Sequence, residues 1–169
     1  MLVRVSDVGL QTERLPMRAA VARALLDDRV TADRLLGATL PPDWPQPDLL
    51  DVLPAQAAAE LDEIRFGVWV IIERKTNTVV GDIGFMGSPS AEGTLEIGYS
   101  VIPDRRRRGY ATEAARAMVE WALGQPEVRC LVAGCDADNE ASIRILERLG
   151  FARSAPSARN QVRWRLGSS

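Results

Sequence analysis

The hydrophobic pattern changes period in the middle of the chain, and this change constrains the fold more than any other feature. Three stretches have the alternating, β-branched composition of strands, and the residues Thr76-Asn77-Thr78 between the first two predict a hairpin turn. The three predicted strands are Val68–Glu73, Val79–Phe85 and Thr94–Ile102. A chain with consecutive strands at its centre builds its core on a β-sheet.

Beyond Gly109 helices and single strands alternate. A helical face there is formed by small and apolar residues: Ala111, Ala114, Ala115, Met118 and Ala122. The pattern then predicts a buried strand over Val128–Ala133, a helix over Asn139–Leu149 that stops at Gly150, and closing strands over Phe151–Ser154 and Gln161–Leu166. This order predicts an α/β domain of the layered α+β type, with crossover helices on a mixed sheet.

The N-terminal third reads as a short strand followed by helices. Residues 10–18 predict a first strand, at an edge or with an irregular start because of Pro16. Helices are predicted over Ala19–Asp27 and Thr31–Ala38, and residues 41–47 are too rich in proline to be regular. Residues 48–63 are helical again, and Pro54 predicts a broken or late-starting helix. No repeat or linker interrupts the chain, so we expect a single domain over residues 1–169.

Composition excludes several classes of protein. The chain has 169 residues, of which 46% are hydrophobic and 26% charged, a balance typical of globular proteins. No apolar run approaches the roughly 18 residues of a membrane span, and the N-terminus lacks a signal-peptide pattern, so we expect a cytoplasmic protein without a membrane partner. Cys130 and Cys135 are expected to be buried, reduced thiols on opposite sides of one strand, with no partner ligands for a metal.

The chain has no histidine, which excludes every mechanism that depends on an imidazole base. A carboxylate must therefore help, directly or through water, to remove a proton from a reacting group. The formal net charge of −2 also argues against a nucleic-acid partner, because generic nucleic-acid binders are basic.

An arginine-rich loop precedes the helix that opens at Gly109. Residues Arg105-Arg106-Arg107-Arg108 follow the end of a predicted strand. A helix N-terminus offers unpaired N–H groups, glycine allows close approach to the backbone, and arginines add charge-assisted contacts. Together they predict a site for phosphate or pyrophosphate, although it is neither a Walker loop nor a dinucleotide fingerprint. A solvated basic loop is the alternative interpretation.

Several motifs together resemble the GNAT N-acetyltransferases. Arg106–Ala111 matches the signature Gln/Arg-x-x-Gly-x-Gly/Ala, and Glu96–Pro103 resembles the fourth strand of that family. Asn139–Phe151 matches its Asn-x-x-Ser…Leu-Gly-Phe helix, while Thr12–Leu15 is similar to the start of the RimJ/RimL-like branch. The resemblance is dense over residues 80–151. It implies a mostly antiparallel twisted sheet with helices on both faces, a splayed pair of central strands, and acetyl-CoA as the co-substrate.

The resemblance also implies roles for individual residues. The CoA pyrophosphate would be held, mainly by backbone N–H groups, at Arg106, Arg107, Arg108, Gly109, Tyr110, Ala111 and Thr112. The backbone of Tyr99, Ser100 and Val101 would pair with the pantetheine arm.

On the helix that follows, Asn139 would touch the pantetheine and Ser142 would stabilise or protonate the departing thiolate. The alternative interpretation is that Asn139 only caps its helix and that Ser142 fills space. Many relatives use a tyrosine later on this helix, at the position held here by Leu146.

Glu96 is the candidate general base, because an alkylamine is mostly protonated at neutral pH and must lose a proton before it attacks. Strand alternation puts Glu96, Gly98 and Ser100 on one face. The alternative is that Glu96 is a half-exposed residue that pairs with an arginine. Asp82, on the neighbouring strand, is a second and weaker candidate.

The segment 43–63 contains six carboxylates and neither lysine nor arginine: Asp43, Asp48, Asp51, Glu60, Asp62 and Glu63. In similar enzymes this region flanks the acceptor cleft, where an acidic rim would attract a cationic amine such as a peptide N-terminus, a polyamine or an aminoglycoside. A solvated helix face is the alternative. Trp44 either lines this cleft or covers the core, whereas the three other tryptophans are expected to pack.

The sequence thus predicts an enzyme that moves acetyl from acetyl-CoA to a primary amine by direct attack in a ternary complex, with no metal and with a homodimer as a possible assembly. Two rival hypotheses stay open. A non-catalytic, CoA-binding regulatory module would bind the cofactor without turnover, and a phosphate- or nucleic-acid-binding module would use Arg105–Arg108 and ignore CoA.

Overall fold

A single sheet of seven strands forms the centre of the described structure, in the order β1-β2-β3-β4-β5-β7-β6. The computed structural model describes residues 10–59, 64–154 and 160–167. Every neighbouring pair in the sheet is antiparallel except β4 and β5, which are parallel. The strands are β1 Thr12–Pro16, β2 Val68–Glu73, β3 Thr78–Phe85, β4 Thr94–Val101, β5 Cys130–Asp136, β6 Ala152–Arg153 and β7 Gln161–Gly167.

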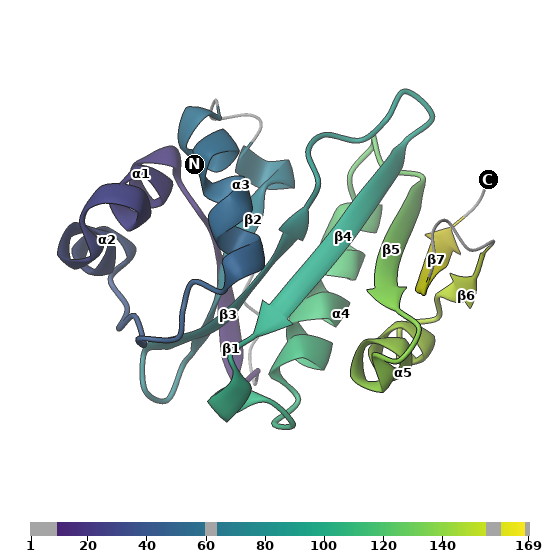
Figure 1. The fold of residues 1–169 in the computed structure, drawn as a ribbon. Coiled ribbons are helices and arrows are strands. Elements are labelled where there is room, and N and C mark those ends of the chain that lie inside the picture. Colours follow the sequence, from purple (N-terminus) through teal and green to yellow (C-terminus); the bar gives the residue numbers. More distant parts are fainter. Residues whose placement is uncertain (1–9, 60–63, 155–159, 168–169) are drawn as a thin grey trace.

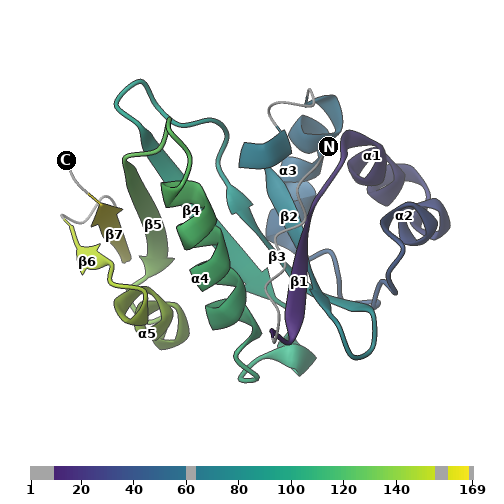
Figure 2. The ribbon, with the colours of Figure 1, turned by 180° about the vertical axis from the view of Figure 1, so that it is seen from behind.

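Helices cover both faces of the sheet (Figures 1 and 2). The α-helices are α1 Ala19–Asp27, α2 Arg29–Leu36, α3 Pro47–Ala58, α4 Tyr110–Leu123 and α5 Glu140–Arg148, and two short 3₁₀ turns occur at Ile64–Phe66 (η1) and Pro103–Arg105 (η2). The helices α1 to α3 lie over one face, and α4 and α5 lie over the other. The fold class predicted from the sequence is therefore confirmed.

The central strands β4 and β5 pair over a short stretch only. Residues Thr94–Glu96 pair with Cys130–Val132, and beyond Glu96 the ladder stops although both strands continue. This confirms the predicted splayed pair. Backbone N–H and C=O groups of β4 and β5 beyond this point have no partner in the other strand, so the sheet has an opening at its centre.

Two hydrophobic cores hold the layers together. The core under α4 and α5 contains Trp69, Ile83, Met118, Leu131 and Leu146, all at most 2% exposed. Within it Trp121 stacks on Phe85 with ring centroids 5.8 Å apart, as expected for a packing tryptophan. The core under α1 to α3 includes Trp44, Leu49, Leu53, Val70 and Ile72.

Most predicted elements are present with ends shifted by a few residues, and β1 lies at the sheet edge as Pro16 indicated. The prediction that Pro54 breaks or delays the third helix is wrong, since α3 runs from Pro47 through Pro54 to Ala58. The carbonyl that loses its partner belongs to Leu50, a residue that is 45% exposed. The helix ends before 63, and residues 60–63 lie outside the described residues.

Glu113 on α4 fastens the helix to the edge strand β1. Its carboxylate accepts hydrogen bonds from the backbone N–H groups of Gln11 at 3.1 Å and Thr12 at 2.8 Å, and from Thr12 Oγ1 at 2.5 Å. Thr12 is completely buried, so its donors have no access to water if the carboxylate is lost. Because an unsatisfied buried donor loses its full hydration, this contact is important for stability.

We predict that Glu113→Ala lowers the free energy of unfolding by about 2 kcal/mol, because it leaves buried donors of Thr12 without an acceptor. Urea denaturation followed by tryptophan fluorescence measures the change. Glu120→Ala, an exposed position on the same helix, is the matched control and should change stability by no more than about 0.5 kcal/mol. Equal effects of the two substitutions would contradict this role of Glu113.

Candidate active site

The predicted phosphate site lies where β4 ends and α4 begins. Gly109 is the N-cap of α4 with φ +83°, and the first intrahelical bond runs from the Glu113 N–H to the Gly109 carbonyl. The N–H groups of Tyr110, Ala111 and Thr112 thus have no intrahelical acceptor. Gly109 is exposed, and a Cβ there would meet nothing within 4 Å. This geometry fits an anion held by backbone N–H groups at the positive end of the helix dipole.

Three of the four arginines and the tyrosine of this loop contact other protein groups, and the weakest of these contacts is from Arg108 Nη2 to the Asp104 carbonyl at 3.4 Å. The Tyr110 hydroxyl donates to the buried carboxylate of Glu73 on β2, and Arg105 forms an ion pair with Glu73 at 3.1 Å. Arg106 Nε donates to the Val101 carbonyl at 2.9 Å. Hydrogen bonds from Thr76 and Tyr110, with the charge of Arg105, hold the pKa of Glu73 below its usual value. Glu73, which was not predicted from the sequence, fixes the loop.

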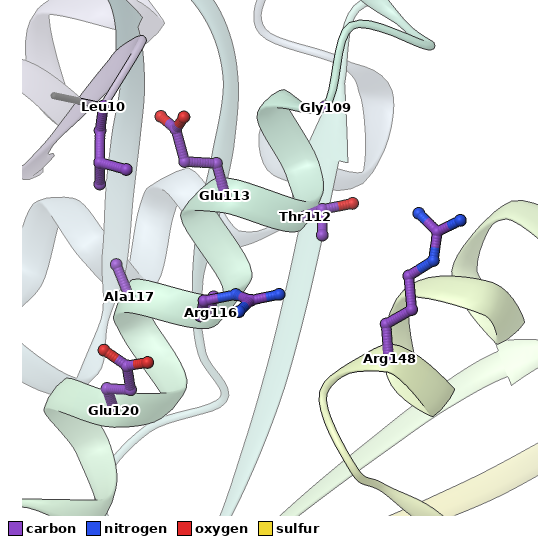
Figure 3. Close-up of a pocket in the computed structure, with 8 residues that line it drawn as sticks. All are labelled: Leu10, Gly109, Thr112, Glu113, Arg116, Ala117, Glu120 and Arg148. Atoms are coloured by element: carbon purple, nitrogen blue, oxygen red, sulfur yellow. The ribbon is translucent and has the colours of Figure 1, made fainter.

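A pocket of about 450 Å³ adjoins this helix N-terminus (Figure 3). Gly109, Thr112 and Arg116 line it from α4, and Arg148 lines it from α5. In Figure 3 the side chains of Arg116 and Arg148 extend into the space between the two helices. Neither arginine was predicted from the sequence. Arg116 lies one helical turn after Thr112, and this spacing is the only signal that could have identified Arg116.

The helix α5 presents Asn139 and Ser142 near the opening between β4 and β5. Asn139 caps the helix, since its Oδ1 accepts from the Ser142 backbone N–H at 3.1 Å, so the capping interpretation is confirmed and contact with a cofactor stays a prediction. Leu146 is 1% exposed and belongs to the core. On the same side of the sheet, Tyr99 of β4 and Cys135 of β5 pack against that core.

On the opposite face, Glu96 is held by an arginine. Arg163 on β7 donates to Glu96 Oε1 at 2.6 Å, and both side chains are about one third exposed. The arginine pairing that the sequence left open is therefore present, and the role of Glu96 as a base stays a prediction. No hydrogen bond involving its second oxygen, Oε2, occurs among the described residues.

Asp82 on β3 lies on the same face as Glu96, opposite Ser100 in the ladder. Its Oδ2 accepts from Trp44 Nε1 at 2.9 Å and from Ser100 Oγ at 3.2 Å. Burial raises the pKa of Asp82 to about 6 against the opposing effect of these two bonds, and the nearby charge of Asp48 adds to the increase. Trp44 is thus both a fully buried core residue and the donor to a titratable group.

Two glycines leave the strand backbones accessible between these carboxylates. Gly98 on β4 and Gly134 on β5 lie beyond the last β4–β5 pair, where these two strands no longer pair with each other. A Cβ at Gly98 would meet only the end of the flexible, exposed Met86 side chain, and one at Gly134 would make ordinary contacts with Arg163 and Glu96. On the face that bears Glu96, Gly134 is therefore exposed and Gly98 is partly exposed.

The remaining predictions concern cysteines, metals and membranes. Cys130 is buried as expected, whereas Cys135 is only partly buried, and both thiols are free. In the described part of the chain no group of three or more His, Cys, Asp or Glu residues is placed to hold a metal ion. Among the described helices none is long and apolar enough to cross a membrane.

The incomplete pairing of β4 and β5 and the exposed N-terminus of α4 are the features that the sequence predicted for an acetyl-CoA-dependent acyltransferase. Comparison with known proteins supports this class of enzyme. The model of the acetyltransferase (GNAT) domain matches residues 17–152. The uncharacterized N-acetyltransferase YjdG of Bacillus subtilis (strain 168) is 31% identical over 160 residues, which cover 93% of each chain. The chain belongs to the GNAT acetyltransferase family.

Solved structures show the same fold. RimL, a ribosomal L7/L12 alpha-N-protein acetyltransferase, was solved with coenzyme A in a disulfide to one of its cysteines; it superposes with a TM-score of 0.71 at 17% identity and 98% coverage of each chain. The microcin C7 self-immunity acetyltransferase MccE, in complex with acetyl-CoA and AMP, has a TM-score of 0.65 at 16% identity, with 97% of this chain and 94% of that chain covered. These likenesses confirm the fold, and the resemblance to the RimJ/RimL-like branch stays a prediction.

The raised pKa of Asp82 predicts a pH-dependent stability. Because the folded protein holds this proton more tightly than the unfolded chain, its contribution to stability is lost as the pH rises from about 4 through 6. We expect the unfolding free energy of the parent to fall by about 2 kcal/mol over this range relative to Asp82→Asn. Urea titrations at several pH values test this, with Asp51→Asn, an exposed position, as the control. Parallel curves for the parent and Asp82→Asn would disprove it.

Proposed function

We propose that this chain, as one domain over residues 1–169, transfers the acetyl group of acetyl-CoA to a primary amine by direct attack in a ternary complex. The observation that supports this most is the opening between β4 and β5, which has a phosphate-type helix N-terminus on one side and two carboxylates on the other. The free thiols support a reducing, cytoplasmic environment.

Acetyl-CoA supplies the acetyl group as a reactive thioester, and the residues of the α4 side fit its parts. Its pyrophosphate would bind the backbone at residues 106–112, with Arg107 and Arg108 as the exposed guanidinium groups. In the pocket beside this helix, Arg116 and Arg148 would bind further phosphate, although Glu113 and Glu120 line the same pocket. Unpaired backbone groups of residues 99–101 would bond the amides of the pantetheine arm, beside Asn139 and Ser142.

The sulfur end of the cofactor would then lie between β4 and β5, near Cys135. In the RimL structure coenzyme A forms a disulfide with a cysteine, so a cysteine in that protein comes within bonding distance of the cofactor sulfur. We propose that the sulfur of this chain's cofactor lies beside the free thiol of Cys135, which lies on β5 three residues beyond the last β4–β5 pair.

The amine would approach from the face of α1 to α3. Glu96 Oε2 has no hydrogen bond in the described structure and can accept a proton from the amine, directly or through water, while Arg163 fixes the orientation of the carboxylate. Asp82 and Asp48 make this face acidic and attract a cationic acceptor once Asp82 is ionised. RimL is named for a protein α-amine, and MccE was solved with AMP, so peptide N-termini and small-molecule amines are both candidate acceptors.

The proposal is tested by thiol release from acetyl-CoA with short peptides, polyamines, aminoglycosides and free amino acids, alongside calorimetry of acetyl-CoA binding. Turnover on one class of amine supports the enzyme and identifies its substrate chemistry. Binding with no turnover on any amine favours the regulatory module, which the core position of Leu146 supports, because no tyrosine is present there to act as the acid. No binding of acetyl-CoA would refute the proposal.

We predict that Glu96→Gln lowers kcat by about 100-fold or more with the preferred amine, because general-base assistance contributes factors of this size. The remaining rate should rise with pH in proportion to the free-amine fraction. Glu92→Gln, on the exposed loop before β4, is the control and should match the parent. If the base is Asp82 instead, Asp82→Asn abolishes the rate while Glu96→Gln keeps the parent pH profile.

We predict that Gly109→Ala weakens acetyl-CoA binding about tenfold, because a side chain at φ +83° forces the helix N-terminus away from its anion-binding conformation. Gly87→Ala is a matched control, since Gly87 has φ +89° and also nothing within 4 Å of an added Cβ. Both substitutions should cost similar stability, and only the first should change the dissociation constant measured by calorimetry. Equal dissociation constants for the two variants would place the phosphate elsewhere.

A further inference from the structure

The hydroxyl group of Tyr99 is buried at the opening between β4 and β5 without a conventional partner. Its oxygen has almost no solvent-accessible surface and forms no hydrogen bond of standard geometry with the described residues. Buried hydroxyl groups are nearly always hydrogen-bonded, and an exception requires an explanation. A ligand that displaces the neighbours of this oxygen when it binds, and then accepts a hydrogen bond from the hydroxyl, is such an explanation.

The surroundings of this hydroxyl indicate where the ligand lies. The β4–β5 ladder ends at Glu96 and Val132, so three further residues along each strand bring Tyr99 level with Cys135, in the unpaired region. Burial raises the pKa of Tyr99 to about 12. The side chain of Ser142 lies near enough to lower this pKa, and Cys135 lies near enough to raise it further. The phenol therefore lies among groups from β5 and from the start of α5, and it keeps its proton at neutral pH.

We propose that the Tyr99 hydroxyl donates a hydrogen bond to the sulfur of coenzyme A and stabilises the thiolate as it leaves. This inference rests on the proposed function, which places the sulfur between β4 and β5. Ser142 would donate to the Tyr99 oxygen, which makes the phenol a stronger donor. The sequence analysis assigned only the backbone of Tyr99 to the cofactor and gave the thiolate to Ser142. The structure instead supports a pair in which a strand tyrosine takes the place of the helix tyrosine absent at Leu146.

The proposed contact is consistent with the balance of the reaction. The amine nitrogen forms a bond with the acetyl carbon, and the carbon–sulfur bond breaks with its electron pair on sulfur. The proton of the amine goes to Glu96 or to water, and the thiolate later takes a proton from solvent. Tyr99 stays protonated throughout, because its pKa is far above that of a thiol, so it acts as a hydrogen-bond donor at the sulfur.

Binding of free CoA tests this contact without any acceptor amine. A donor that favours the thiolate lowers the pKa of the bound thiol, so the parent should bind CoA more tightly as the pH rises from 7 to 9. In Tyr99→Phe the increase in CoA affinity between pH 7 and pH 9 should be smaller than in the parent by a factor of about 10 to 100. This factor corresponds to the usual strength of a hydrogen bond to a charged group. Desulfo-CoA, which lacks the thiol, is the control ligand, and both proteins should bind it equally at every pH. A phosphine reductant keeps Cys135 and CoA from forming a disulfide.

Activity provides a second readout once an acceptor is known, because Tyr99→Phe should lower kcat about 10- to 100-fold with little change in KM for acetyl-CoA. The substitution keeps the ring that packs in the core and removes an oxygen without a standard hydrogen bond, so the variant should unfold at the same urea concentration as the parent. If the parent binds no CoA, the proposed function itself fails. If both proteins bind CoA with the same pH dependence, the role of Tyr99 is refuted and the proposed function stands.

Discussion

The incomplete pairing of β4 and β5 is the constraint on which the rest of the structure depends. A sheet normally satisfies every interior N–H and C=O group, and here the ladder stops after Glu96 and Val132 while both strands continue. In the proposed function, this gap is where ligands on the two faces of the sheet would meet. Helices α4 and α5 can then hold a ligand on one side while carboxylates of β3 and β4 meet a second molecule on the other (Figure 1).

The elements beside this opening are held in place by contacts with other parts of the protein. Glu73 holds the loop before α4 through Tyr110 and Arg105, and Glu113 holds the same helix against β1. Both glutamates are structural, and both work because a carboxylate accepts several hydrogen bonds at once. Helix α4 thus keeps its exposed N-terminus at a fixed place relative to β4, which lowers the entropy cost of binding a ligand there.

The two carboxylates of the acceptor face are made different by their surroundings. Arg163 keeps Glu96 paired, whereas Asp82 is buried beside Trp44 and Ser100 with its pKa raised to about 6. Different environments allow neighbouring carboxylates to do different tasks at one pH. In the proposed reaction, Glu96 would take a proton while Asp82 would set the charge that a cationic acceptor meets.

The sequence by itself determined the order of elements, the layered fold, the edge position of β1 and the glycine at the start of α4, because period, proline and helix-start signals are local. It also indicated the family through Arg106–Ala111 and Asn139–Phe151. Contacts between distant segments were decided only by the tertiary structure: Glu73 with Tyr110, Asp82 with Trp44, and Tyr99 beside Ser142. Burial and partners set the chemistry of these side chains, and neither can be read from spacing along a chain.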